Sequence, residues 1–241
     1  MYGKFCTYSI VTLGLVLAIP SFGDVVPVAT TDDETIAGAV DLSGDTSPSI
    51  DITGSLASSS ITEQVYGVVV FKIDILNPLN FSAETVDAGP HGLADTALFL
   101  FDSSGNGVYM NDDKSGGDTL SCLPSSMALS TPADCPVSST TLGPQSAGIY
   151  YLAISASSNY PIDALSNEIF SPSSSTDVVG PNSLVGPLGG WDGGAFASPD
   201  FDNVNYSIEL SDAPEPASWP VVAGLGLAII LVQRRLRLRT R

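Results

Sequence analysis

Side chains that bind hard cations gather in two short stretches of the sequence, Asp102–Gly107 and Asn111–Asp113. Proteins bind calcium through carboxylate, amide, hydroxyl and carbonyl oxygens, and glycines let the chain turn sharply around the ion. A calcium site is therefore one interpretation of this region. The candidate ligands are Asp102, Ser104, Asn106, Asn111, Asp112 and Asp113.

The spacing of these residues partly follows the EF-hand loop, since Asp102, Ser104, Asn106, Gly107 and Asp113 fall on its positions 1, 3, 5, 6 and 12. We do not expect an EF-hand, because predicted strands flank the loop and position 12 carries Asp instead of a bidentate Glu. The alternative is a solvated hairpin turn. Such a turn needs only the Asn, Asp and Gly residues that form Asx-turns.

The cysteines predict a disulfide. Cys6 lies in an N-terminal segment with the features of a signal peptide, so the mature chain keeps Cys122 and Cys135. A cysteine pair in an exported domain predicts a disulfide, which would add about 3 kcal/mol by restricting the unfolded chain. The alternatives are two free thiols or a metal pair, and a metal pair would need further His or Cys ligands.

Residues for nucleophilic or zinc-dependent catalysis are scarce. His91 is the single histidine of the chain and lies in a Gly/Pro turn, and the sequence has no G-x-S-x-G or H-E-x-x-H motif. Many acidic residues are present, but their spacing singles out no pair. We therefore expect a non-catalytic protein. The alternative is a secreted hydrolase that uses two carboxyl groups about 5–9 Å apart.

The middle of the chain predicts strands and turns. Period-two alternation marks strands at Val65–Leu76, Ile149–Ser155 and Val204–Leu210, and the apolar run Ala97–Phe101 predicts a strand buried on both faces. Weaker strand candidates are Ile36–Val40 and Ile50–Ile52. Because no long amphipathic helix separates these strands, we expect an all-β, jelly-roll-like antiparallel β-sandwich.

Residues 156–203 are rich in Gly, Pro and Ser, which predicts a long loop region with one or two short strands. Trp191 lies in this region, in the segment GGWDGG. A tryptophan that stacks on a sugar is one interpretation of this residue. We favour one that packs against the protein.

Charge is distributed unevenly along the chain. Between Asp24 and Glu215 lie all 26 acidic residues but just two bases, Lys72 and Lys114, a formal net charge of −24. This excludes a nucleic-acid-binding domain, because neutralising phosphates requires a basic surface. Five of the remaining bases are arginines in the last eight residues: Arg234, Arg235, Arg237, Arg239 and Arg241.

The N-terminal segment, residues 1–23, has the pattern of a signal peptide. Lys4 provides a short positive region, Ser9–Ile19 is apolar, and Ser21 and Gly23 place small residues before a cleavage site at Asp24. We therefore expect the protein to be exported.

The C-terminal segment, residues 213–241, combines a short motif, an apolar stretch and a basic tail. Pro214, Glu215 and Pro216 precede a predicted transmembrane helix at about 217–233, and the arginines follow it. Arginines retained on the cytoplasmic side give the topology of a single-pass inner-membrane precursor. The apolar part, Trp219–Val232, would span roughly 21 Å as a helix against a hydrocarbon core of about 30 Å, which predicts a marginal anchor.

This order of three elements resembles the PEP-CTERM sorting signal of Gram-negative bacteria. The resemblance implies recognition by exosortase, a membrane cysteine protease-transpeptidase, with cleavage near Pro214–Pro216 and release or transfer to the cell surface. Ala213 stands where many members of that family have Val. The alternative is a permanently anchored type I surface adhesin.

A second resemblance covers the exported domain, residues 24–212, with a core at about 62–211. The segments DTALFLFDSSGNGV, NDDKSGGD, AGIYYLAIS and NYSIEL are similar to the bacterial pre-peptidase C-terminal (PPC) domain, through Asp95, Asp102, Tyr150 and Tyr206 among others. The resemblance implies a jelly-roll-like sandwich, usually non-catalytic, that in some members binds calcium or polymers. Taken together, the two resemblances lead us to expect an exosortase substrate at the cell surface or in the extracellular polysaccharide matrix.

Overall fold

The structure is a computed structural model that describes residues 24–28, 34–45, 47, 49–56, 67–126, 131–136, 142–193 and 204–212. All regular elements in these ranges are strands. The predicted signal peptide and the predicted helix at 217–233 lie outside the described residues. Within the described ranges, no helix has the length and apolar character needed to cross a membrane.

Ten strands form two five-stranded sheets. The outer sheet has the order β1 (Asp24–Pro27), β3 (Ser49–Leu56), β12 (Val204–Ser211), β5 (Ser82–Val86) and β8 (Cys122–Leu123). The central sheet has the order β2 (Val40–Asp41), β4 (Val68–Ile75), β9 (Gly148–Ala156), β6 (Thr96–Asp102) and β7 (Gly107–Asn111). A separate hairpin consists of β10 (Pro161–Asp163) and β11 (Leu188–Trp191).

The two sheets are mixed, so the prediction of a purely antiparallel sandwich was wrong at one edge of each sheet. β1 runs parallel to β3, with Asp24 opposite Ile50, and β2 runs parallel to β4, with Val40 opposite Phe71. Both parallel strands come from the N-terminal part of the chain, and they extend sheets whose other pairs are antiparallel.

The two sheets pack face to face around one apolar core. Ile52 and Ile208 of the outer sheet and Phe71, Leu100 and Leu152 of the central sheet are fully buried in this shared cluster. Period-two alternation places these residues on the inward faces of their strands. The predicted sandwich architecture is therefore confirmed at the level of two packed sheets.

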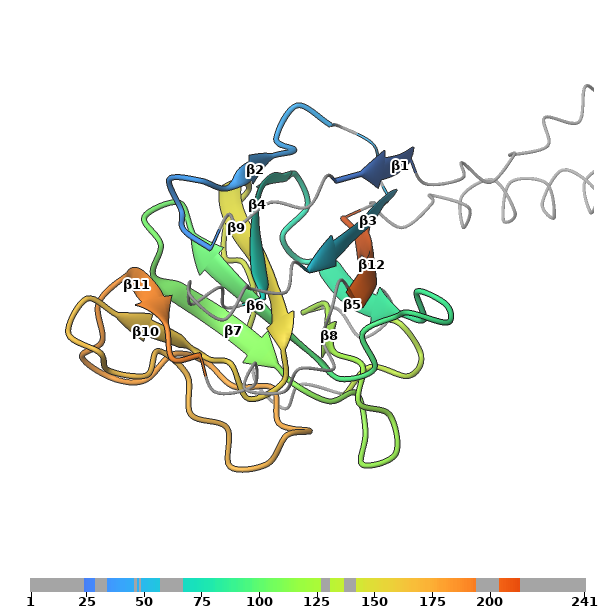
Figure 1. The fold of residues 1–241 in the computed structure, drawn as a ribbon. Helices are drawn as coiled ribbons and strands as arrows, with labels where there is room; N and C mark the ends of the chain where they lie inside the picture. Colours follow the sequence, from blue (N-terminus) through green and yellow to red (C-terminus); the bar gives the residue numbers. More distant parts are fainter. Residues whose placement is uncertain are drawn as a thin grey trace, which may run out of the picture.

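A third layer covers the other face of the central sheet. Ala97, Phe99 and Phe101 of β6 alternate with the inward Leu98 and Leu100, and they pack against Ile169, Phe170 and Trp191. Figure 1 shows the β10–β11 hairpin on the side of the central sheet that faces away from β3, β5 and β12. The prediction that Ala97–Phe101 is buried on both faces is confirmed.

Most predicted strands are found close to their predicted bounds. β4, β6, β9 and β12 correspond to the four strong predictions, and β3 contains the weak candidate Ile50–Ile52. Ile36–Val40 is wrong as a strand, since β2 begins at Val40 and residues 36–38 form a turn. β10 and β11 are the short strands expected in residues 156–203.

Two further predictions are confirmed in this part of the chain. Cys122 and Cys135 form a disulfide, with their Cα atoms 5.5 Å apart, which ties a loop to the end strand β8. Trp191 is 3% exposed, its ring centroid lies 5.3 Å from that of Phe99, and its Nε1 donates to the carbonyl of Glu34 over 2.8 Å. Trp191 therefore packs against the protein and is not presented to a sugar.

Replacing Trp191 tests how firmly the third layer is packed. We expect Trp191→Ala to lower the free energy of unfolding by roughly 3–5 kcal/mol, because it removes a buried aromatic side chain and leaves a cavity over β6. Trp191→Phe, which keeps part of the packing, should cost less. Denaturant unfolding measures both.

The matched control is Leu165→Ala in the same layer, where the side chain is 82% exposed. Its expected effect is within about 0.5 kcal/mol. Equal losses for Trp191→Ala and Leu165→Ala would contradict a packed third layer.

Candidate metal centre

Three aspartates meet at one end of the β6–β7 hairpin. Asp95 directly precedes β6, and Asp112 and Asp113 directly follow β7. The antiparallel register pairs Leu98 with Asn111, so the residue before β6 and the two residues after β7 come together. One carboxylate oxygen from each of the three lies within 4.8 Å of the other two.

Asp112 is the buried member of this aspartate cluster. It is 3% exposed, and its Oδ2 accepts hydrogen bonds from the Tyr160 hydroxyl over 2.9 Å and from Ser157 Oγ over 3.3 Å. Its Oδ1 is buried and has no hydrogen-bond partner in the described part of the chain. The carboxylate is therefore half satisfied.

The electrostatics of the cluster disfavour its ionised state. Burial raises the pKa of Asp112 to about 6; the hydrogen bonds from Tyr160 and Ser157 oppose this rise, and the charges of Asp113 and Asp95 add to it. Burial also raises the pKa of Asp95. A hydrogen bond from Ser157 opposes this rise, and the charge of Asp113 adds to it. Any positive charge near these oxygens would stabilise their ionised forms.

The other end of the same hairpin holds the first three predicted ligands. Asp102 Oδ1 accepts the backbone N–H groups of Ser104, over 2.8 Å, and Asn106, over 3.0 Å, and the side-chain amide of Asn106 donates to both Asp102 oxygens. Gly105 adopts φ +84°, which the tight turn requires. This is the Asx-turn arrangement, the alternative that the sequence left open.

The structure thus divides the predicted ligands between two places. β7 spans five residues, roughly 17 Å, so Asp102, Ser104 and Asn106 lie well apart from Asp112 and Asp113. Asn111 is buried, its Nδ2 donates to the carbonyls of Asp113 and Asp177, and its Oδ1 accepts the N–H of Cys122. The Asn111 side chain therefore links the backbone at Asp113, Asp177 and Cys122.

Asp95 is not among the predicted ligands because it lies 17 residues before Asp112 in the sequence. The signal that could have found it is hairpin pairing. Two predicted strands joined by a turn at Asp102–Gly107 place the residues flanking their outer ends side by side.

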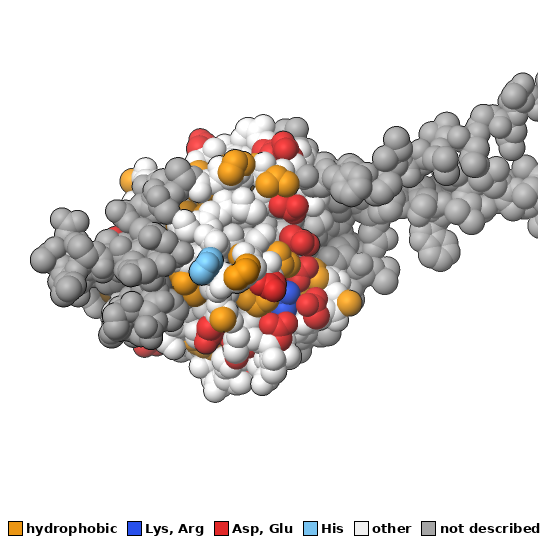
Figure 2. Space-filling model, turned by 45° about the vertical axis from the view of Figure 1, so that its right-hand side comes forward, with side chains coloured by type: hydrophobic (Ala, Val, Ile, Leu, Met, Phe, Trp, Pro, Cys, Tyr) orange, Lys and Arg blue, Asp and Glu red, His pale blue; other side chains and the backbone are white. Residues whose placement is uncertain are grey.

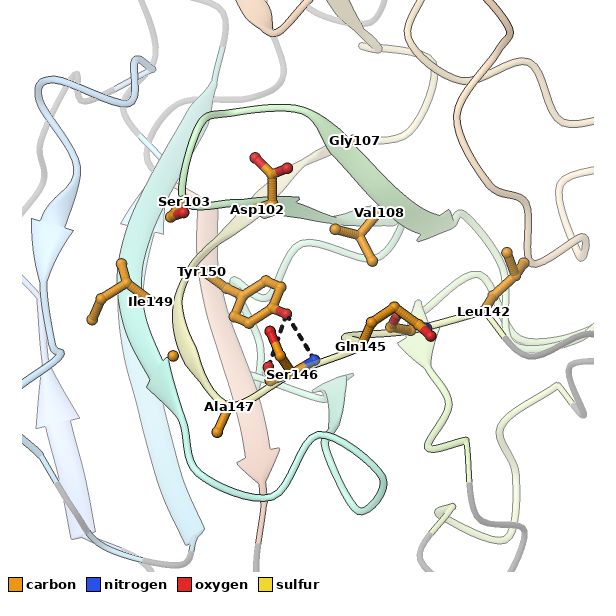
Figure 3. Close-up of a pocket in the computed structure, with 12 residues that line it drawn as sticks. Asp102, Ser103, Gly107, Val108, Leu142, Gln145, Ser146, Ala147, Ile149 and Tyr150 are labelled. Carbon is orange, nitrogen blue, oxygen red and sulfur yellow. Dashed lines mark hydrogen bonds between the residues drawn. The ribbon is translucent and has the colours of Figure 1, made fainter.

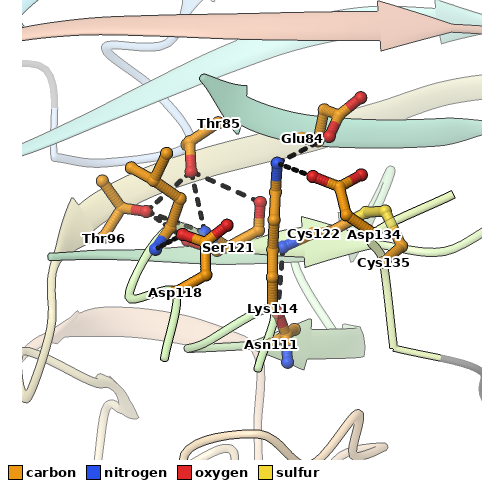
Figure 4. A network of polar contacts seen from close by, with 11 residues as sticks. Glu84, Thr85, Thr96, Asn111, Lys114, Asp118, Ser121, Cys122, Asp134 and Cys135 are labelled. Carbon is orange, nitrogen blue, oxygen red and sulfur yellow. Dashed lines mark hydrogen bonds and ion pairs between the residues drawn. A yellow bond between two sulfur atoms is a disulfide. The ribbon is translucent and has the colours of Figure 1, made fainter. Parts of the chain in front are cut away.

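The two lysines between residues 24 and 212 each pair with carboxylates outside this cluster. Lys114 is 6% exposed, and its Nζ lies 2.6 Å from Glu84 Oε2 and 3.3 Å from Asp134 Oδ2, beside the Cys122–Cys135 disulfide (Figure 4). Burial lowers the pKa of Lys114, but the bonds and charges of Glu84 and Asp134 outweigh it and raise the pKa overall. Lys72 Nζ lies 2.9 Å from Asp41 Oδ2.

Two cavities of the described fold do not supply a pair of carboxyl groups for hydrolysis. A cavity of about 560 Å³, between the β6–β7 turn and the start of β9, is lined by Asp102 as its one carboxylate, with Gln145, Ser146 and Tyr150 nearby (Figure 3). The Tyr150 hydroxyl donates to the Ser146 carbonyl over 2.9 Å. A second cavity, of about 510 Å³, is lined by Asp87 as its one carboxylate.

A comparison of the chain with known protein families and with curated proteins finds no match.

The raised pKa of Asp112 predicts a pH-dependent stability in metal-free buffer. The unfolded carboxyl loses its proton near pH 3.8 and the folded one near pH 6, so between these values the folded state binds more protons. The free energy of unfolding should therefore fall as pH rises from about 4 to 6, by up to roughly 3 kcal/mol.

Other carboxyl groups titrate in the same range, so the measurement is the difference between the wild type and Asp112→Asn. Urea unfolding at several pH values should give a wild-type curve that falls more steeply than that of the variant. Parallel curves would show that Asp112 does not carry a raised pKa.

Proposed function

We propose that this chain is a non-catalytic exported protein that its C-terminal segment sorts to the cell surface or the extracellular polysaccharide matrix. The observation that carries the proposal is the order of the last 28 residues: Pro214–Glu215–Pro216, an apolar stretch, and five arginines. Exosortase is the expected processing enzyme, and the inner membrane is the expected site of the precursor.

Two features of the described domain support export. The Cys122–Cys135 disulfide suits an oxidising compartment outside the cytosol. Bases are nearly absent from the domain between Asp24 and Glu215, while the arginines are confined to the chain end, which is the asymmetry expected of a translocated domain followed by a cytoplasmic tail.

The position of the motif relative to the fold also supports the proposal. β12 ends at Ser211, three residues before Pro214, and its residues pair with both β3 and β5. Cleavage near the motif would leave the interior of the outer sheet intact. The two-sheet architecture agrees with the sandwich that the PPC resemblance implies. We further propose that the strands of this sandwich are connected in the jelly-roll order.

Intact-mass analysis of the protein from a host that contains exosortase tests the sorting proposal. We expect the mature protein to lack the residues that follow the PEP region. Replacing Pro214, Glu215 and Pro216 together by Ala should prevent this loss, because the recognition motif is removed.

Pro90→Ala is the matched control, a change of an exposed proline outside the C-terminal segment that should leave processing unchanged. A wild-type mass that includes the full C-terminus would overturn the sorting proposal and favour the permanently anchored adhesin.

A further inference from the structure

We propose that Asp95, Asp112 and Asp113 bind one calcium ion, which fastens the third layer of the fold to the end of the β6–β7 hairpin. This inference concerns the folded domain and does not depend on the sorting of the C-terminus. Oxygens bound to calcium lie 2.3–2.6 Å from the ion, so two ligands are at most about 5.2 Å apart. The three aspartate oxygens, within 4.8 Å of one another, meet this limit.

The unpartnered oxygen of Asp112 is the observation that points to a ligand. A buried carboxylate oxygen without a donor is costly, and native structures seldom retain one without a reason. Asp112 is held in place by Tyr160 and Ser157 through its Oδ2, while Oδ1 has no partner among the described residues. A cation beside the two neighbouring carboxylates would satisfy this oxygen.

A positive charge that compensates the three aspartates would have to come from an ion in solution. Lys72 and Lys114 are the two bases between residues 24 and 233, and each is bonded to other carboxylates. Figure 2 shows one face of the molecule, on which acidic side chains gather with few basic ones among them. Three carboxylates within 4.8 Å therefore have no lysine or arginine of the described chain to neutralise them.

The cluster is open to an entering ion on one side. Asp95 is exposed and Asp113 is half-buried, whereas Asp112 forms the buried floor. Calcium takes six to eight oxygens, so water would complete a coordination sphere that these carboxylates begin. Sites of this open kind in extracellular modules bind calcium with dissociation constants of about 10⁻⁴–10⁻³ M.

Calcium at this position would join segments that are distant in sequence. The Tyr160 hydroxyl donates to Asp112, and the Tyr160 ring packs edge-on against Phe99, with centroids 6.1 Å apart. The Asp113 N–H donates to the Ser175 carbonyl over 2.8 Å. An ion held by Asp95, Asp112 and Asp113 would therefore stabilise the contact between the central sheet and the layer that contains β10 and β11.

Calcium titration of the full-length chain, stripped with EDTA, tests the proposal by calorimetry and by melting temperature. We expect one calcium per chain and a melting temperature that rises with calcium concentration. Asp112→Asn should lose both responses. This variant should fold, because Asn keeps an acceptor for Tyr160 and places an amide beside two carboxylates, so its melting temperature without calcium should equal or exceed that of the wild type.

Asp102→Asn is the matched control, with the same charge change at the opposite end of the same hairpin and an acceptor retained for its turn. It should bind calcium like the wild type, and Asp113→Asn should bind at least tenfold more weakly. Three results would each overturn the proposal: a wild type without a calcium response, an Asp112→Asn variant that responds like the wild type, or loss of binding in Asp102→Asn alone. A response to magnesium but not to calcium would overturn the assignment of the ion.

Discussion

The structure depends on the burial of the central sheet on both of its faces. A sheet covered on one side can alternate apolar and polar residues, but β6 must be apolar at nearly every position, because its two faces meet two different layers. Leu98 and Leu100 pack toward the outer sheet, while Phe99 and Phe101 pack toward the segment of residues 160–191. From that segment, the buried side chains of Ile169, Phe170 and Trp191 pack on this second face.

This arrangement explains which features of the fold the sequence revealed. Four strands could be predicted, β4, β9 and β12 from their strong alternation and β6 from its continuous apolar run. In each of them the side chains within the strand decide which residues are buried. β5 carries polar residues such as Ser82 and Glu84, and β7 is a short segment that begins at Gly107 and ends at Asn111; both are strands because neighbouring strands pair with them. The parallel pairing of β1 with β3 and of β2 with β4 likewise depends on tertiary contacts, which no local sequence pattern encodes.

The candidate site was partly predictable for the same reason. Asp112 and Asp113 were identified from their oxygen chemistry and from the glycines near them. Asp95 enters the cluster only through the β6–β7 register, and Asp102 leaves it because the length of β7 separates the two ends of the hairpin. The oxygen ligands that lie close together in sequence therefore divide between the Asx-turn at Asp102 and the cluster that contains Asp112 and Asp113.

The number of hydrogen-bond donors around a carboxylate separates these two kinds. Asp102 and Asp163 each precede an asparagine by four residues, and each accepts the N–H and the side-chain amide of that asparagine. Hydrogen bonds from Asn167, Gly186 and Leu165 hold the pKa of Asp163 well below its usual range. Burial instead raises the pKa of Asp112, whose two donors both bond one oxygen. An aspartate saturated by amide donors, such as Asp163, is stabilised as an anion by the chain itself, whereas a bound cation would be needed to stabilise Asp112 as an anion beside two other carboxylates.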